Sequence, residues 1–250
     1  MVSMSTSFTL SRIMLQEPPL SEPALVLWKT YIAEWTHPHR RTRKREAAEA
    51  LTNFVTVLLS SGARARDDFA RWLFSSVVDY HADLPIQSQL VEEVLAPYVS
   101  RTIEQSGDSE DIVTVALGRL ESRLSRVYKN DIVGATSVPE LLTRALRVSS
   151  DPRLVCALRD FHFARLADAC HEMPIGWVAP LSAVEESLKV LESLRDRFAA
   201  CFTKRDLRAL AGYFAVWKAW QDYIESKSAA GFGDWCAQNG RSWRIPYGIT

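Results

Sequence analysis

The amino-acid sequence predicts an all-α protein. Apolar residues recur at the three- and four-residue spacing of a buried helix face along most of the chain, and residues that favour helix ends stand at the borders of these segments. The period-two alternation that is typical of strands is absent, and no Asn-Gly hairpin signal stands between β-branched runs. We therefore expect about nine helices in antiparallel hairpins, arranged as an irregular α-solenoid or an orthogonal helical bundle.

Three regions divide the chain. We expect residues 1–20 to form a poorly ordered or extended N-terminal segment, and residues 21–230 to form the helical domain. Residues 231–250 are rich in glycine and aromatic residues and are predicted to form a tail that packs back on the domain. The looser stretch near 130–137 is the candidate subdomain boundary, although it is too short for a flexible linker.

The first two helices are marked by their ends. A helix over about 21–35 is predicted because Ser21 is a favourable N-cap and Pro23 stands in the first turn. The second helix is expected to begin near residue 42 and to end near Gly62. Its apolar face is predicted to consist of Leu51, Phe54, Val55, Leu58 and Leu59.

The third helix is predicted over 66–80. Asp67 and Asp68 would lie in its first turn, where carboxylates interact favourably with the helix dipole. Its inner row is expected to contain Phe69, Leu73, Val77 and Tyr80.

The middle of the chain continues the helical pattern. A helix over about 86–106 is expected to kink or break at Pro97, and the next is predicted to run without interruption over 110–128. Ser137 and Glu140 have the spacing of a capping box, which predicts a further short helix.

The last third of the chain has similar signals. A long helix is predicted over about 150–172. The next is expected to start at a capping box of Ser182 and Glu185, and the one after it at a cap formed by Thr203 and Asp206.

Charge and composition exclude several classes of protein. The chain has 30 Lys plus Arg and 30 Asp plus Glu, so no global field attracts nucleic acid or an anionic membrane. It offers no run of about 18 apolar residues for a membrane span, and its first residues do not resemble a signal peptide. We therefore expect a cytoplasmic protein without membrane interactions.

The four cysteines are predicted to be reduced thiols. They lie far apart in the sequence without a Cys-x-x-Cys pair, which argues against a disulfide framework or a zinc site. We expect Cys156, Cys170 and Cys201, which fall within helical patterns, to be unpaired and mostly buried.

The segment HPHRRTRKRE, from His37 to Glu46, is the main candidate binding site. Its cations precede a helix whose dipole already presents positive charge, an arrangement that favours an external anion. We predict an anion- or partner-binding site formed by Arg40, Arg41, Arg43, Lys44 and Arg45. The alternative is that these cations are solvated or pair with acids of the same chain, such as Glu34, Asp67 or Asp68.

A secondary basic surface is predicted on the helix over 110–128. Arg119, Arg123 and Arg126 share one face of that helix and would extend a surface that follows phosphates. Glu121 and the acidic segment SGDSED lie close by, so an ordinary exposed face is the alternative interpretation.

No catalytic residue, metal site or cofactor is predicted. The nearest approaches to a metal site place their acidic and histidine residues two apart, at which spacing side chains on a helix diverge by about 200°. These residues are His37 and His39 in one segment and Asp79, His81 and Asp83 in another.

Known catalytic motifs are also missing. The chain contains no P-loop, dinucleotide, nucleophile-elbow or zinc-protease motif. The paired magnesium motifs of class I terpene synthases each lack a ligand here, because Arg71 and Val138 stand where a carboxylate or its equivalent is required.

Aromatic residues concentrate near the C-terminus. Four of the eight tryptophans, Trp217, Trp220, Trp235 and Trp243, lie in the last part of the chain. They form either a core seam that the tail covers or a hot spot for a partner, since Trp, Tyr and Arg dominate such sites.

These observations predict a non-enzymatic cytosolic protein-interaction module, such as an adaptor, a complex subunit or an immunity-type protein. It would use the basic helix N-terminus and an aromatic surface. The alternative is a nucleic-acid-binding subunit that contacts phosphates through the Arg40–Arg45 cluster. A groove that joins this cluster to the secondary basic surface would favour nucleic acid, whereas an isolated cluster beside exposed aromatic residues would favour a protein.

Overall fold

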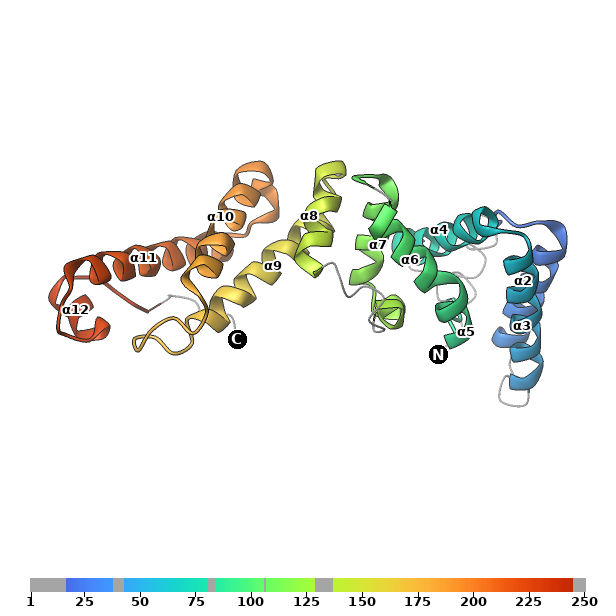
Figure 1. Cartoon of the computed structure of the whole chain (residues 1–250), viewed down its shortest axis with the longest axis horizontal. Coiled ribbons are helices and arrows are strands. Elements are labelled where there is room, and N and C mark those ends of the chain that lie inside the picture. Colours follow the sequence, from blue (N-terminus) through green and yellow to red (C-terminus); the bar gives the residue numbers. More distant parts are fainter. Residues whose placement is uncertain (1–16, 38–42, 81–83, 106, 129–136, 245–250) are drawn as a thin grey trace. The chain divides into compact units, whose positions relative to one another are not determined.

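Every regular element is helical in the part of the chain that the computed structural model describes, which comprises residues 17–37, 43–80, 84–105, 107–128 and 137–244 (Figure 1). No strand occurs in these residues, so the all-α prediction is confirmed. With the continuous helical segment 88–105 counted once, they contain ten helices besides the short 3₁₀ turns, close to the nine expected.

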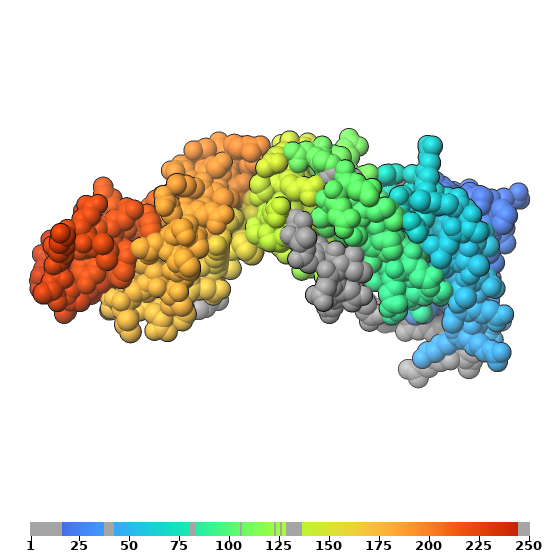
Figure 2. Space-filling model, viewed as in Figure 1, coloured from blue at the N-terminus to red at the C-terminus, as the bar shows by residue number. Residues whose placement is uncertain are grey.

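The chain divides into two compact units between Ser149 and Ser150. We call residues 1–149 unit 1 and residues 150–250 unit 2. Within each unit, side chains close the gaps between the ribbons (Figure 2). The stretch near 130–137 lies almost entirely outside the described residues, as does most of the N-terminal segment 1–20.

Unit 1 begins with two helices that pack against each other, α2 (Glu22–Thr36) and α3 (Lys44–Ser60). Their core is aromatic, since the Trp28 ring lies 5.2 Å from the Phe54 ring and 5.0 Å from the Phe69 ring. The predicted apolar face of α3 is buried at Leu51, Phe54, Val55 and Leu58, whereas Leu59 is partly exposed.

Helix α4 (Ala63–Tyr80) starts three residues earlier than predicted. Asp67 and Asp68 therefore lie in its second turn, and their predicted place in the first turn is wrong. Phe69, Leu73 and Val77 are buried as expected, but Tyr80 is 42% exposed because it is the last residue of the helix.

The next helical segment contains the disruption predicted at Pro97. It consists of α5 (Ser88–Leu90), a π-helical turn η1 (Val91–Leu95) and α6 (Ala96–Gln105). Proline lacks an N–H donor, and in an α-helix its ring collides with the carbonyl four residues earlier. The wider turn just before Pro97 relieves that collision, so the chain bulges there instead of breaking.

The helix predicted over 110–128 is interrupted. Helix α7 (Glu110–Leu120) ends before Glu121, whose backbone is extended with ψ of 119°, and a 3₁₀ helix η2 (Ser122–Tyr128) follows. The buried Tyr128 hydroxyl donates a hydrogen bond to the carbonyl of Val115 at 2.6 Å. This bond holds η2 against α7. The prediction of one continuous helix is therefore wrong.

Helix α8 (Val138–Val148) completes unit 1 and packs against α7. The Ser137 hydroxyl accepts a hydrogen bond from the Glu140 N–H, which is one of the two bonds of the predicted capping box.

Unit 2 contains four α-helices and a short 3₁₀ turn in its described residues: α9 (Pro152–Ala169), α10 (Leu181–Arg197), η4 (Ala199–Cys201), α11 (Lys204–Ser226) and α12 (Phe232–Gln238). Thr203 and Asp206 form the reciprocal capping box at the start of α11. The box predicted for Ser182 and Glu185 does not form, because α10 already begins at Leu181.

The aromatic residues near the C-terminus form a packing seam between α11 and α12. The Trp220 ring lies 4.8 Å from the Phe232 ring, edge to face, and Ala219 and Trp235 are buried beside them. This arrangement fits the core interpretation of these residues better than an exposed hot spot.

The four cysteines are free thiols. Cys236 is buried in the α11–α12 seam. Cys156, Cys170 and Cys201 are only half-buried, so the prediction that they are mostly buried is wrong.

Candidate functional site

The basic cluster is divided by the fold. Arg40 and Arg41 lie outside the described residues. Arg43 occupies the N-cap position of α3 and donates hydrogen bonds of 2.9 and 2.8 Å to the two carboxylate oxygens of Glu34 on α2. Lys44 and Arg45 are exposed in the first turn of α3. One member of the predicted anion site is therefore an internal ion-pair partner.

The secondary basic surface is not a single helical stripe. Arg119 lies on α7, whereas Arg123 and Arg126 lie on η2 beyond the break at Glu121, and their side chains are outside the described part of the structure. The Arg119 guanidinium lies 5.3 Å from the centre of the Tyr128 ring. This cation–π contact helps to hold η2 against α7.

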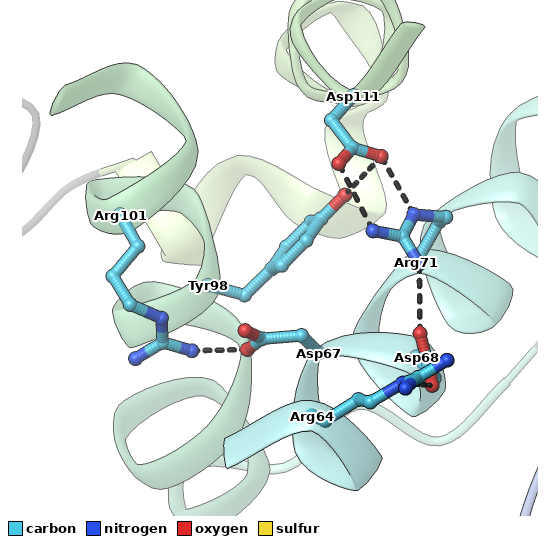
Figure 3. Close-up of polar contacts among 7 residues, drawn as sticks. All are labelled: Arg64, Asp67, Asp68, Arg71, Tyr98, Arg101 and Asp111. Carbon is cyan, nitrogen blue, oxygen red and sulfur yellow. Dashed lines mark hydrogen bonds and ion pairs between the residues drawn. The ribbon is translucent and has the colours of Figure 1, made fainter. Parts of the chain in front are cut away.

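A network of paired charges joins α4 to α6 and α7 in unit 1 (Figure 3). Arg71 donates to both carboxylate oxygens of Asp111, at 2.6 and 2.9 Å, and to Asp68 at 2.9 Å. Arg101 on α6 binds Asp67, and the Tyr98 hydroxyl lies 3.5 Å from Asp111. The two adjacent aspartates of α4 therefore bind different arginines and do not converge on one ligand.

The electrostatics of this network indicate a structural role. The Arg71 guanidinium holds the pKa of Asp111 below its usual value, and burial raises the pKa of the Tyr98 hydroxyl. Asp111 is therefore ionised at neutral pH and Tyr98 is protonated. Among the described residues, no group of three or more His, Cys, Asp or Glu is placed to hold a metal ion. Because arginines neutralise the carboxylates, the network is suited to clamping helices together.

Replacing Arg71 by glutamine is expected to lower the free energy of unfolding by about 1–2 kcal/mol, because it removes a bidentate pair at a partly exposed site. Urea unfolding followed by circular dichroism measures this loss. Arg64→Gln is the matched control, since Arg64 is 96% exposed and 3.9 Å from Asp68. Equal stability of the wild type and Arg71→Gln would contradict the clamp.

A groove in unit 2 is the apolar feature that sequence reasoning missed. Phe161, Ala164 and Asp168 follow one another along one face of α9. The loop after α9 turns back over the end of this helix, because the Val178 N–H donates a hydrogen bond of 2.8 Å to the Ala169 carbonyl. A hollow of about 490 Å³ results, which is lined by Phe161, Ala164, Arg165, Asp168, Ala169, His171, Val178 and Ala179. We call this feature the unit 2 groove.

The unit 2 groove has an apolar surface with a few charges. Phe161 is 36% exposed and Val178 is 58% exposed, and Ala164 of the same lining is also exposed. Arg165 pairs with Glu186 of α10 at 3.0 Å, while Asp168 contributes the opposite charge to the lining. The groove therefore carries no strong field of either sign.

Exposed apolar residues continue along the chain beside this groove. Ile175, at 84% exposed, and Leu181, at 44% exposed, flank Val178 in the sequence. The spacing of Phe161, Ala164 and Asp168 on one helix face could have pointed to the α9 side of the groove. No local pattern links them to Val178.

Comparison with known proteins gives no relative: the chain matches no family model, and no similar curated protein or solved structure was found. None of the described helices is long and apolar enough to cross a membrane.

Proposed function

We propose that this protein is a non-enzymatic, cytosolic helical module that binds another protein through the unit 2 groove. The observation that carries the proposal is the exposed apolar lining around Phe161, Ala164 and Val178. Exposed apolar surface of this kind marks interaction sites, because covering it removes it from water.

The expected occupant is the apolar face of a partner helix or short peptide. The small side chains of Ala164 and Ala179 leave room in the lining for larger partner side chains beside Phe161 and Val178. The lining contains one cation that is already paired and one nearby acid, so it complements a partner surface with little net charge. The absence of a net charge on the whole chain agrees with this choice.

Nucleic-acid binding is the second candidate. The exposure of Lys44 and Arg45 in the first turn of α3 favours it. Other cations of unit 1 are engaged within the chain: Arg43 with Glu34, Arg119 with Tyr128, Arg144 with the Ile103 carbonyl and Arg147 with Asp108. These contacts reduce the positive charge available for a phosphate backbone, so we favour a protein partner.

Replacing Ala164 by arginine tests the proposal. A long charged side chain in the lining should weaken partner binding by at least about tenfold, because it fills the groove and must be desolvated there. Arginine favours helices, and Asp160 and Asp168 stand four residues away on either side, so folding should be preserved. Proximity labelling in cells would compare the partners of the two forms, followed by dissociation constants with the purified partner.

Ala215→Arg is the matched control, because it places the same side chain on an exposed helical position of α11 outside the groove. We expect this variant to keep every partner that Ala164→Arg loses. A partner set shared by all three forms would contradict the groove. If instead Lys44→Gln with Arg45→Gln abolishes a salt-sensitive interaction with nucleic acid, the second candidate is correct.

A further inference from the structure

The loop between α9 and α10 holds an apolar side chain out in solvent. Ile175 is 84% exposed, the largest exposed fraction among the large apolar residues that the structure describes. Its neighbours are anchored inward. A Cβ atom at Gly233 of α12 would lie 3.2 Å from Pro174 Cγ, and the Trp177 ring lies 5.8 Å from the Trp217 ring of α11. Because the loop is anchored on both sides, Ile175 forms a fixed protrusion that loses little conformational entropy on binding.

This protrusion shares one surface with the unit 2 groove. Ile175 stands three residues before Val178 of the groove lining, a stretch that spans at most about 11 Å. The hollow of about 490 Å³ has small side chains at Ala164 and Ala179, which leaves room for an apolar side chain. A surface that combines an apolar protrusion with an apolar hollow is able to cover a second copy of itself. In a two-fold symmetric pair, the protrusion of each copy faces the hollow of the other.

The charges of the lining are also self-complementary. Arg165 and Asp168 are three residues apart on α9, so they are neighbours on the helix surface, about 5–6 Å apart. A two-fold axis that crosses the line between them at its midpoint places Arg165 of each copy opposite Asp168 of the other, which forms two ion pairs across the interface. Arg165 also binds Glu186 at 3.0 Å. A guanidinium has five N–H donors, so it can bind a second carboxylate.

We propose that the occupant of the unit 2 groove is a second copy of this chain, bound in a two-fold symmetric dimer. The inference rests on the proposed function, because it takes the groove to be a protein-binding surface and names its partner. A second copy supplies the protrusion, the hollow and both charges together. The chain has 30 Lys plus Arg and 30 Asp plus Glu, so no net charge drives two copies apart.

Sedimentation velocity of the purified full-length protein, measured from about 1 to 100 µM, tests the proposal. The wild type should show a dimer whose share rises with concentration. Ile175→Lys should raise the dissociation constant of the dimer at least about tenfold, because it replaces the apolar protrusion by a charge. Ile224→Lys is the matched control, since Ile224 is 55% exposed on α11 and lies outside the lining. It should dimerise like the wild type.

An exchange of charges tests the proposed contact itself. In a dimer of Arg165→Asp, acids face acids at both contacts, and in a dimer of Asp168→Arg, cations face cations. Each variant should therefore dimerise at least about tenfold more weakly than the wild type. In an equal mixture of the two variants, every acid faces a cation, so a mixed dimer should form with close to wild-type affinity. Circular dichroism of each variant checks that the fold is retained.

Any of three results would overturn the second copy as the occupant: a wild type that stays monomeric at about 100 µM, a dimer that Ile175→Lys leaves unchanged, or a mixture of the charge variants that forms no mixed dimer. A photocrosslinking amino acid at Ala164 separates this failure from that of the proposed function. An adduct with only a different protein overturns the dimer alone, whereas the absence of any protein adduct overturns both.

Discussion

Replacing Gly118 by leucine should lower the free energy of unfolding of unit 1 by about 3 kcal/mol. A Cβ atom at this position would lie 2.5 Å from two ring carbons of Phe74 and 3.0 Å from the Tyr128 hydroxyl. Phe74 is fully buried and its rigid ring cannot withdraw. The loss should therefore exceed the gain of about 1 kcal/mol in helix propensity that a residue other than glycine brings.

Urea unfolding followed by far-UV circular dichroism measures the effect. Gly107→Leu is the control, because a Cβ at the exposed Gly107 meets nothing within 4 Å. A stability of Gly118→Leu equal to that of the control would contradict the close packing of α7 on α4. Gly118→Ala should show a smaller loss in the same direction, about 1–2 kcal/mol.

Acid should destabilise unit 2 through a single buried histidine. His162 of α9 is 3% exposed, and its Nδ1 lies 3.2 Å from the Ser187 hydroxyl of α10. Ser187 donates its hydroxyl proton to the Ala183 carbonyl, so the imidazole Nδ1 must carry the proton that joins the two helices. This bond needs only the Nδ1 proton, which the neutral imidazole can supply.

The pKa of His162 is lowered to about 4, mainly by burial and also by the nearby Arg165, while Glu186 opposes these effects, so the ring is neutral at neutral pH. The unfolded chain binds this proton at an ordinary pKa of about 6.5. Between these two values the unfolded state carries more protons, so stability falls as the pH falls through this window. The total loss should be about 3 kcal/mol.

Thermal unfolding measured across this pH range checks the prediction. His162→Gln keeps an amide donor for Ser187 but cannot titrate, so its stability should change less between pH 6.5 and 4. His171→Gln is the control, because His171 is exposed and forms an ion pair with the exposed, adjacent Glu172 when it is protonated. The same pH dependence in wild type and His162→Gln would contradict a neutral buried histidine.

The sequence was sufficient for much of the secondary structure because helix ends are local. The capping box of Thr203 and Asp206 joins residues three apart, and both hydrogen bonds are present. Pro97 likewise disrupts its helix through atoms within one turn. Such effects depend on neighbours that can be read directly from the chain.

The break at Glu121 could not be predicted in this way. The segment from 110 to 128 has helical periodicity throughout, and its last residue, Tyr128, contacts α7 only after the chain has folded back. The close approach of Gly118 to Phe74 depends on the same tertiary packing. Tertiary contacts of this kind override local helix propensity.

The candidate sites also depend on tertiary contacts that the sequence does not show. The sequence identified a group of cations and also named Glu34 as an internal partner, but only the packing of α2 on α3 shows that Arg43 binds it. The unit 2 groove joins α9 to a returning loop through the bond from Val178 to Ala169. The α9 side could be read from the helical spacing of its residues, but no local pattern in the sequence links that side to the loop.

Protein binding in the unit 2 groove is tested most directly by a photocrosslinking amino acid placed at Ala164 in cells, with the same amino acid at Ala215 as the reference. The proposed function predicts a discrete protein adduct at Ala164 that is absent at Ala215. Any of three results would contradict it: no adduct at Ala164, the same products at both positions, or an adduct with nucleic acid at Ala164.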